Sequence, residues 1–349
     1  MTTDPPSPRR MLLLKPCCIG DVIMATALLA ALRRAYPAAH ITWGVGTYSA
    51  RAIVDHPLLD DLLPTGPAAN PARSLRGLWR LARQMRAGHF DLAVVPVRSP
   101  LIGLAVWLAG VPIRAGLDSA GRGVFYSVRA PVDPAEPRHE AEIYLDVARA
   151  LGLDTSDCWA NVPVDPARGD RLPVPAEARG GLVVVHVGGG QNPGMAMAEK
   201  RPPLPLLADV AGRAAALTGG RIAILGGPLD GARAEALHEA LAGQSPLILV
   251  NALDFGGIAA LGAAARLVIG PDTGLVHLMA AAGAPTVMIF GPSDPRRYAP
   301  FVPPGRAAAP WRPFAMPAGG VSGGVPEGWN WDEHGVSADE VWDQIRTLL

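Results

Sequence analysis

Short apolar segments alternate with helical patterns along most of the chain, and this alternation limits the fold more than any other feature. Strands that alternate with helices are typical of parallel sheets, because a parallel connection needs a crossover of about a dozen residues or more. The predicted strands are Met11–Leu14, Ile41–Val45, Leu92–Val97, Gly181–Val187, Arg221–Leu225, Leu247–Val250, Leu267–Ile269 and Thr286–Phe290. The predicted helices are Asp21–Tyr36, Ala208–Leu217, Ala232–Leu241, Phe255–Ala265 and Leu275–Ala282. We therefore predict an α/β fold.

The opening plan of strand, glycine-containing loop and helix restarts near residue 180. A chain of 349 residues has room for about two domains. We expect two Rossmann-like parallel-sheet domains facing a cleft. The predicted boundaries are a disordered tail over 1–10, a first domain over 11–165, a proline-rich linker over 166–180, a second domain over 181–335 and a C-terminal helix over 336–349. Ser337 and Glu340 have the spacing of a capping box at the start of that helix.

Composition excludes several classes of protein. The 31 Lys and Arg residues balance 31 Asp and Glu residues, and aromatic residues make up only 5%, so we expect no nucleic-acid partner. The three cysteines form no CxxC pair, which predicts no zinc site and suits a reducing compartment. The longest uncharged apolar stretch, 101–113, is too short to span a bilayer, and residues 1–10 lack the apolar core of a signal peptide. We expect a cytoplasmic protein.

The segment from Leu267 to Pro295 carries the strongest signal for an anion site. A strand ends at Gly270, and either Asp272 or Thr273 can cap the helix that follows. Open backbone N–H groups at a helix start bind anions, and Gly274 lets a phosphate approach the backbone closely. His277 lies in the first turn and can add a donor. The alternative is an ordinary capped helix that contains a buried histidine.

A second candidate is the segment KPCCIGDV, residues 15–22, at the end of the first predicted strand. Ligands bind at this edge of α/β sheets. Gly20 has no side chain to block the approach of a ligand. Asp21 is either a base that faces the cleft or the N-cap of the helix. The chain contains no GxGxxG dinucleotide fingerprint, and we predict no cofactor and no metal.

Two loops that follow strands add candidate donor-binding residues. Gly188 and Gly189 lie in a glycine loop that leads to Lys200 and Arg201, and such a cradle with a cationic pair suits a diphosphate. Asp230, in the loop after the strand 221–225, can accept a hydrogen bond from a ribose hydroxyl. An ordinary exposed loop with surface charges is the alternative for the glycine loop.

An arginine run lies on a predicted helix over residues 73–86. The pattern predicts that Leu75, Leu78, Ala82 and Met85 form the opposite, apolar face. A solvated face is one interpretation. The other is contact of Arg76 and Arg80 with an anionic acceptor or with lipid headgroups, which would add peripheral contact at the inner face of the plasma membrane.

Together these motifs resemble glycosyltransferase family 9, the ADP-heptose:lipopolysaccharide heptosyltransferases. The resemblance covers residues 11 to about 300 and is carried by three segments. They are IGDVIMATALLAALRRAYP near the start, Lys200-Arg201, and GPDTGLVHLMAAAGAPTVMIFGPSDP. The usual Lys-x-Trp-Pro of the family reads Lys200-Arg201-Pro202-Pro203 here, so its tryptophan is missing. The resemblance implies the GT-B fold, with the acceptor on the first domain and the donor mainly on the second.

The resemblance also implies roles for individual residues. Asp21 would be the catalytic base, Lys200 would contact the donor diphosphate and sugar, and Asp272 would face the transferred sugar. The remaining implied donor contacts are the diphosphate with the backbone of Thr273, Gly274 and Leu275 and with His277, and the ribose with Asp230.

The expected function is therefore an inverting, metal-independent transfer of a heptose or related sugar. The donor would be an ADP-sugar, and the acceptor a hydroxyl of a lipopolysaccharide-core-like glycan or glycolipid. Two alternatives stay open. A non-catalytic two-lobed binding protein for a phosphorylated small molecule would retain a nucleotide-sugar intact. A GT-B nucleotide-sugar epimerase would need no acceptor.

Overall fold

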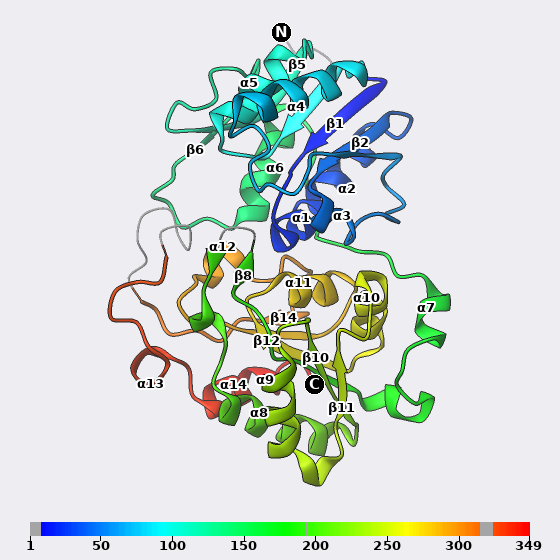
Figure 1. Cartoon of the computed structure of the whole chain (residues 1–349), viewed down its shortest axis with the longest axis vertical. Coiled ribbons are helices and arrows are strands. Elements are labelled where there is room, and N and C mark those ends of the chain that lie inside the picture. The colour runs from blue at the N-terminus through cyan, green and yellow to red at the C-terminus, as the bar shows by residue number, and fades with distance from the viewer. Residues whose placement is uncertain (1–7, 193–194, 315–323) are drawn as a thin grey trace. The chain divides into compact units, whose positions relative to one another are not determined.

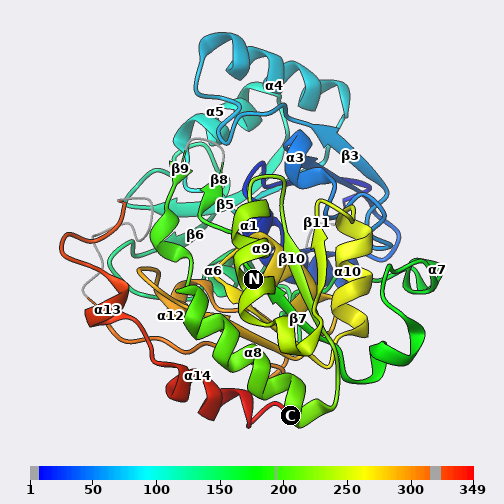
Figure 2. The same ribbon diagram turned by 60° about the horizontal axis from the view of Figure 1, so that its bottom comes forward.

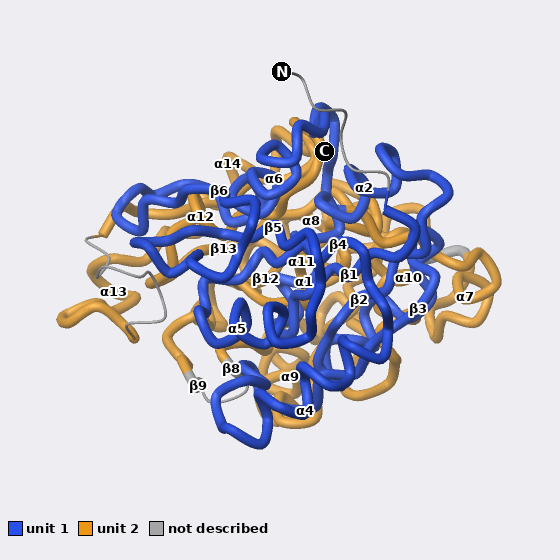
Figure 3. Tube along the Cα trace, turned by 90° about the horizontal axis from the view of Figure 1, so that it is seen from above, with its two compact units in different colours: residues 1–160 blue, residues 161–349 orange. Residues whose placement is uncertain are grey.

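The computed structural model describes residues 8–192, 195–314 and 324–349 and divides into two compact units. The first unit spans residues 1–160 and the second spans residues 161–349, and Figure 3 colours them separately. Each unit contains its own six-stranded sheet. The two Rossmann-like α/β units confirm the predicted fold class, and they are the building blocks of the GT-B fold.

The sheet of the first unit is entirely parallel and has the order β3-β2-β1-β4-β5-β6. Its strands are β1 (Arg10–Leu14), β2 (His40–Val45), β3 (Asp61–Pro64), β4 (Leu92–Val95), β5 (Ile113–Ser119) and β6 (Val128–Val132). The strand order reverses between β1 and β4, and α/β sheets bind ligands beyond the carboxyl ends of the strands at such a reversal.

Helices cover both faces of this sheet (Figure 1). They are α1 (Ile19–Met24), α2 (Thr26–Ala35), α3 (Thr47–Ala50), α4 (Leu75–Ala87), α5 (Pro100–Leu108) and α6 (Glu140–Ala150). Leu12 and Leu14 of β1 pack with α4 and α5 in one core cluster. Because successive strand residues point to opposite faces, the equally buried Met11 and Leu13 lie on the other face of the sheet.

The second unit repeats this architecture, with the order β11-β10-β7-β12-β13-β14. Its strands are β7 (Val183–His186), β10 (Ile222–Gly226), β11 (Leu247–Val250), β12 (Leu267–Pro271), β13 (Thr286–Ile289) and β14 (Ala307–Ala308), all parallel. The strands β8 (Gln191–Asn192) and β9 (Met195–Ala196) form a separate antiparallel pair. Here the order reverses between β7 and β12.

The helices of the second unit also lie on both faces of its sheet. Figure 2 shows α8 (Leu204–Thr218), α9 (Gly231–Ala240) and α14 (Ala338–Ile345) in front of the sheet, and these three helices share one core cluster with it. The helices α10 (Phe255–Ala264) and α11 (Gly274–Ala281) pack against each other, and α11 contacts β12 and β13. The short helices are α7 (Pro166–Asp170), α12 (Pro295–Tyr298) and α13 (Trp331–His334).

The structure differs from the sequence expectations at several element ends. The strand predicted over 92–97 ends at Val95, directly before Pro96, which has no N–H for the sheet ladder. The helix predicted from Asp21 begins at Ile19 and divides into α1 and α2. The strands β3, β5, β6 and β14 were not predicted. Of the tail predicted over 1–10, residues 1–7 lie outside the described residues, whereas Arg10 begins β1.

The predicted linker 166–180 lies within the second unit and contains α7 and the start of a 3-10 turn, Ala176–Gly181. The capping box at Ser337 and Glu340 is confirmed at the start of α14. Over the described part of the chain, every helix is too short or too polar to cross a bilayer.

Candidate functional site

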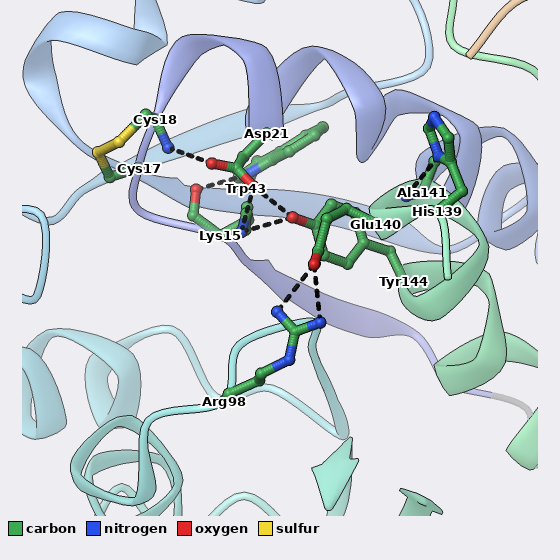
Figure 4. A network of polar contacts seen from close by, with 10 residues as sticks. All are labelled: Lys15, Cys17, Cys18, Asp21, Trp43, Arg98, His139, Glu140, Ala141 and Tyr144. Carbon is green, nitrogen blue, oxygen red and sulfur yellow. Dashed lines mark hydrogen bonds and ion pairs between the residues drawn. A yellow bond between two sulfur atoms is a disulfide. The ribbon is translucent and has the colours of Figure 1, made fainter. Parts of the chain in front are cut away.

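In the first unit, a polar network surrounds Asp21 (Figure 4). The Lys15 ammonium, directly after β1, lies 3.2 Å from Asp21 Oδ1 and donates to the Tyr144 hydroxyl at 3.0 Å. The Tyr144 hydroxyl in turn donates to Asp21 Oδ1. The Cys18 N–H donates to Asp21 Oδ2 at 3.3 Å. One carboxylate is therefore oriented by a strand end, a helix start and helix α6.

These contacts keep Asp21 ionised. Its side chain is 31% exposed and that of Lys15 is 10% exposed. Partial burial raises the pKa of the Asp21 carboxyl. The Lys15 charge and the hydrogen bonds from Tyr144 and Cys18 together lower it by more than burial raises it, so the pKa lies below its ordinary value. Burial and the neighbouring Asp21 charge raise the pKa of Tyr144, which therefore remains a donor. An ionised, partly exposed carboxylate can accept a proton from a bound hydroxyl.

The interpretation of Asp21 as an N-cap is wrong. The N-cap of α1 is Cys18, and Asp21 is the third helical residue, with Gly20 before it. Its carboxylate still assists the helix start, because it accepts the Cys18 N–H. Cys18 is joined to Cys17 by a disulfide between adjacent residues, and Cys158 is a buried free cysteine.

Sequence reasoning missed the residues that hold Asp21 in place. Arg98 follows β4, at the carboxyl edge where the strand order reverses, and its guanidinium makes a bidentate contact of 2.8 and 3.0 Å with Glu140. Glu140 lies one helical turn before Tyr144 on α6, so this ion pair anchors the turn from which Tyr144 reaches Asp21. Lys15 could have been identified from the sequence, because it directly follows the first strand, at the edge of the sheet where ligands bind. No local pattern links Tyr144 to Asp21.

In the second unit, three loops that follow adjacent strands meet at one place. The strands β10, β7 and β12 are neighbours, so their carboxyl ends bring together the loops that contain Asp230, Gly188 and Thr273. A Cβ on Gly188 would collide with the Asp230 carboxylate, and one on Gly189 would collide with the Thr273 methyl group. Gly189 also has a positive φ of 128°, so glycine is required there on two grounds.

A buried ion pair lies beside these loops. Lys200 Nζ is 2.5 Å from Asp272 Oδ2, and both side chains are less than 10% exposed. His277 Nε2 lies 3.7 Å from Asp272 Oδ1. Burial raises the pKa of Asp272, but the Lys200 ammonium and His277 lower it more, so it lies well below its usual range. The pair places one cation and one anion at the start of α11.

Of the two possible caps for α11, the structure uses Thr273. Its hydroxyl accepts the Val276 N–H at 3.4 Å, which leaves the Asp272 carboxylate to its pair with Lys200. Thr273, Gly274 and Leu275 are half-buried at the helix start. This is the location at which an anion would meet the first N–H groups of the helix.

Arginine side chains hold the loops around the pair. The Arg201 guanidinium donates to the Gly189 carbonyl at 2.9 Å and lies 3.8 Å from Asp230. Asp230 Oδ2 accepts the Gly227 N–H at 2.8 Å. Arg233, which sequence reasoning missed, donates to the carbonyls of Val187 and Pro202, on either side of the segment with the glycine loop and Lys200.

The predicted donor-side residues thus gather in one region of the second unit, whereas the acceptor-side arginines Arg76 and Arg80 are exposed on α4 in the first unit. One detail of the helix prediction is wrong: Leu75 is 76% exposed and lies on the arginine face with Trp79, which is 55% exposed. Among the residues that the structure describes, no three His, Cys, Asp or Glu side chains cluster as metal ligands.

Comparisons with known proteins give the family and the fold of this chain. The sequence profile of glycosyltransferase family 9 (heptosyltransferase) matches residues 78–307, more than half of the chain. Lipopolysaccharide heptosyltransferase 1 of Escherichia coli K12 is 25% identical over 301 residues, which cover 82% of this chain and 89% of that relative.

Solved structures share the fold. A family 9 glycosyl transferase from Veillonella parvula superposes with a TM-score of 0.81 at 24% identity and covers 97% of both chains. An Escherichia coli heptosyltransferase solved with ADP superposes with a TM-score of 0.69 at 21% identity, over 97% of this chain and 100% of that one. The same Escherichia coli heptosyltransferase was also solved with ADP-2-deoxy-2-fluoro heptose. With the family profile matched over more than half of the chain and the fold shared over nearly its whole length, the chain is a glycosyltransferase that belongs to family 9, the heptosyltransferase family.

Proposed function

We propose that this enzyme transfers a heptose, or a related sugar, from an ADP-sugar to a hydroxyl of a lipopolysaccharide-core-like glycan or glycolipid. The transfer inverts the anomeric centre and uses no metal ion. The observation that carries the proposal is the buried Lys200–Asp272 pair at the start of α11, beside the glycine loop. The names of the relatives, one of which was solved with ADP, support the choice of donor.

On the donor side, the second unit offers positive charge where negative charge develops. When the bond between the anomeric carbon and the diphosphate oxygen breaks, the electron pair leaves with ADP. The Lys200 ammonium and the N–H groups at the start of α11 stabilise that charge without rearrangement. Asp272, held ionised by Lys200, faces the transferred sugar, and Asp230 accepts from the ribose.

On the acceptor side, Asp21 acts as the general base. It removes the proton of the acceptor hydroxyl as the hydroxyl oxygen attacks the anomeric carbon. Its Oδ1 is engaged by Lys15 and Tyr144, which fix the orientation of the carboxylate. A single displacement from the face opposite the leaving group inverts the anomeric centre, and the proposed mechanism contains one displacement.

The sequence also supports transfer without a metal ion, because it contains no DxD pair of the kind that holds a cation on a nucleotide-sugar. Lys200 and the helix start would take the role of that cation. The rate should therefore be unchanged by a chelator.

The exposed face of α4 suits an anionic, amphiphilic acceptor. Arg76 and Arg80 share this face with exposed Leu75 and Trp79. Cationic and apolar side chains interleaved on one helix face are typical of contact with glycolipid headgroups at a membrane surface. We place the enzyme in the cytoplasm, in peripheral contact with the inner face of the plasma membrane.

Incubation of the purified enzyme with ADP-heptose and a heptose-free lipopolysaccharide core glycolipid tests the proposal. We expect stoichiometric ADP release and a mass gain of one heptose on the acceptor, with inversion seen by NMR and no effect of EDTA. Retention of ADP-heptose intact would favour a binding protein. Its conversion in the absence of acceptor would favour an epimerase. Either of these results overturns the proposal.

A further inference from the structure

The C-terminal segment of the chain packs against the segment that carries Lys200. The Trp331 indole N–H, at the start of α13, donates to the Glu199 carbonyl at 2.8 Å, across 132 residues of sequence. Trp329 lies edge to face with Trp331, with ring centroids 5.3 Å apart, and is itself buried. Gly291 approaches the same place: a Cβ there would lie 2.9 Å from the Trp331 ring and 3.0 Å from the Glu199 carbonyl oxygen.

This contact acts on the backbone of Lys200. The Glu199 carbonyl and the Lys200 N–H belong to one planar peptide group, so a hydrogen bond to the carbonyl orients both. Lys200 also ends a single 3-10 turn, Ala198–Lys200, and its N–H donates to the Met197 carbonyl at 3.3 Å. On the far side, Arg233 holds the Pro202 carbonyl. Hydrogen bonds therefore hold the backbone on both sides of Lys200, and Trp331 makes the one on the N-terminal side.

The segment that carries Lys200, residues 188–203, contains no Phe, Tyr or Trp. The position two residues after the lysine, where the family usually has tryptophan, is Pro202 here. The indole that contacts the segment comes instead from the C-terminal segment.

We propose that Trp331 is a positioning residue for Lys200. It holds the Glu199–Lys200 peptide so that the lysine ammonium lies against Asp272 and, on the proposed function, against the diphosphate of the donor. Trp329 supports the Trp331 ring through their edge-to-face contact. The C-terminal segment is thereby part of the donor site of the second unit.

Trp331→Phe tests this role because it removes the N–H donor and keeps a smaller aromatic ring at the same place. Trp342→Phe is the matched control: Trp342 packs against the same core from α14, and its ring faces Arg213. With ADP-heptose and acceptor at saturation, we expect Trp331→Phe to lower kcat roughly 10-fold, since a small displacement of a catalytic group costs at least that much. We expect the melting temperatures of the two variants to be alike, and kcat of Trp342→Phe to match wild type.

A double-mutant cycle separates positioning from a general loss of structure. If Trp331 acts through Lys200, Trp331→Phe should change kcat less than about 2-fold in a Lys200→Ala background. An equal loss in both backgrounds, or wild-type kcat in Trp331→Phe alone, would overturn the proposal.

Hydrogen exchange gives a readout that does not depend on the proposed function. Peptides that contain Lys200 should exchange faster in Trp331→Phe than in wild type or Trp342→Phe, and unchanged exchange would overturn the positioning role. Absence of sugar transfer by the wild-type enzyme would instead contradict the proposed function and leave the exchange result to decide on Trp331.

Discussion

At the residue scale, both candidate sites contain an aspartate held by a lysine, but the two pairs differ in exposure. The Asp21 side chain is 31% exposed and retains access to a substrate, whereas Asp272 is 9% exposed and lies against Lys200. A buried charge that loses its partner costs about 3–5 kcal/mol, so Asp272 depends on Lys200 for stability as well as orientation. The Lys15–Asp21 pair is partly exposed, so Asp21 depends less on its lysine than Asp272 does, because water also solvates its carboxylate.

Asp21→Asn separates a base from a structural carboxylate. The amide oxygen can still accept the Cys18 N–H, so the start of α1 is retained, but the amide cannot accept a proton. We expect transfer to fall roughly 100-fold or more, with ADP affinity and melting temperature near wild type. The measurement is kcat beside calorimetric ADP binding, and full transferase activity in this variant would remove Asp21 from the role of base.

Lys15→Met should shift the pH profile. The Lys15 charge is the largest influence that lowers the pKa of Asp21, and burial, which raises it, remains in the variant. Asp21 would then become protonated at a higher pH. The acid limb of kcat/KM should move to higher pH, and the stability that Asp21 contributes above its lowered pKa should be lost earlier as pH falls. Tyr144→Phe should move the limb in the same direction, and an unmoved limb in both variants would contradict the assignment.

Lys200→Ala is expected to weaken donor use, and Lys200→Arg to restore only part of it. An ammonium is a compact charge and a guanidinium a planar fork, so they present different geometry to a diphosphate. The alanine variant also leaves Asp272 buried without its cation, so kcat/KM for the donor should be measured below its lowered melting temperature. Unchanged kcat/KM in folded Lys200→Ala would exclude this residue from the donor site.

At the element scale, α4 combines a buried face with an unusual exposed one. Ser74 caps the helix through the Gly77 N–H, and Leu78, Leu81 and Met85 fill the core of the first unit. The outward face carries arginines together with exposed Leu75 and Trp79. This face is therefore free to change charge without disturbing the core.

Charge reversal at Arg76 and Arg80 should raise the acceptor KM and leave ADP affinity unchanged, because α4 belongs to the first unit and the donor residues to the second. Both side chains are exposed, so the substitution should leave folding intact. Steady-state kinetics with each substrate varied in turn checks this. Wild-type kinetics for both substrates would show that the arginines form only a solvated face.

At the scale of the whole molecule, each unit places its candidate residues where its strand order reverses. Lys15, Asp21 and Arg98 lie at the β1–β4 reversal of the first unit. Gly188, Thr273 and Asp272 lie at the β7–β12 reversal of the second. At such a point the connections that leave two neighbouring strands run to opposite sides of the sheet, which leaves room for a ligand between the two loops.

ADP should raise the melting temperature of the enzyme as the ADP concentration increases. The reason is that binding adds to the free energy of unfolding, by about 2.7 kcal/mol at an ADP concentration of 100 times Kd. Asp21→Asn should show the same shift as wild type, and Lys200→Ala a smaller one. Thermal shift with ADP across the three proteins measures this. A shift retained in Lys200→Ala and lost in Asp21→Asn would place nucleotide on the first unit instead.

Local pattern was sufficient for much of the fold. Buried strands such as β10 and β12 consist of unbroken apolar residues, and the loops that follow them were identified as candidate sites because ligands bind at the carboxyl ends of parallel strands. The strand β5 was missed because Arg114 and Asp118 interrupt its apolar pattern. The start of α1 was placed two residues late because Cys18 is not a usual N-cap residue.

The sequence by itself therefore determined the α/β class, the repeat of one plan in two halves and the residues Asp21, Lys200 and Asp272 as candidates. Only the tertiary structure decided that the Tyr144 hydroxyl donates to Asp21 and that Gly188 packs against the Asp230 carboxylate. The same is true of the hydrogen bond from the Trp331 indole to the Glu199 carbonyl. The physical reason is range. Strand and helix preferences depend on neighbouring residues, whereas these contacts join residues far apart in the sequence and depend on strand order and on the packing of every helix against its sheet.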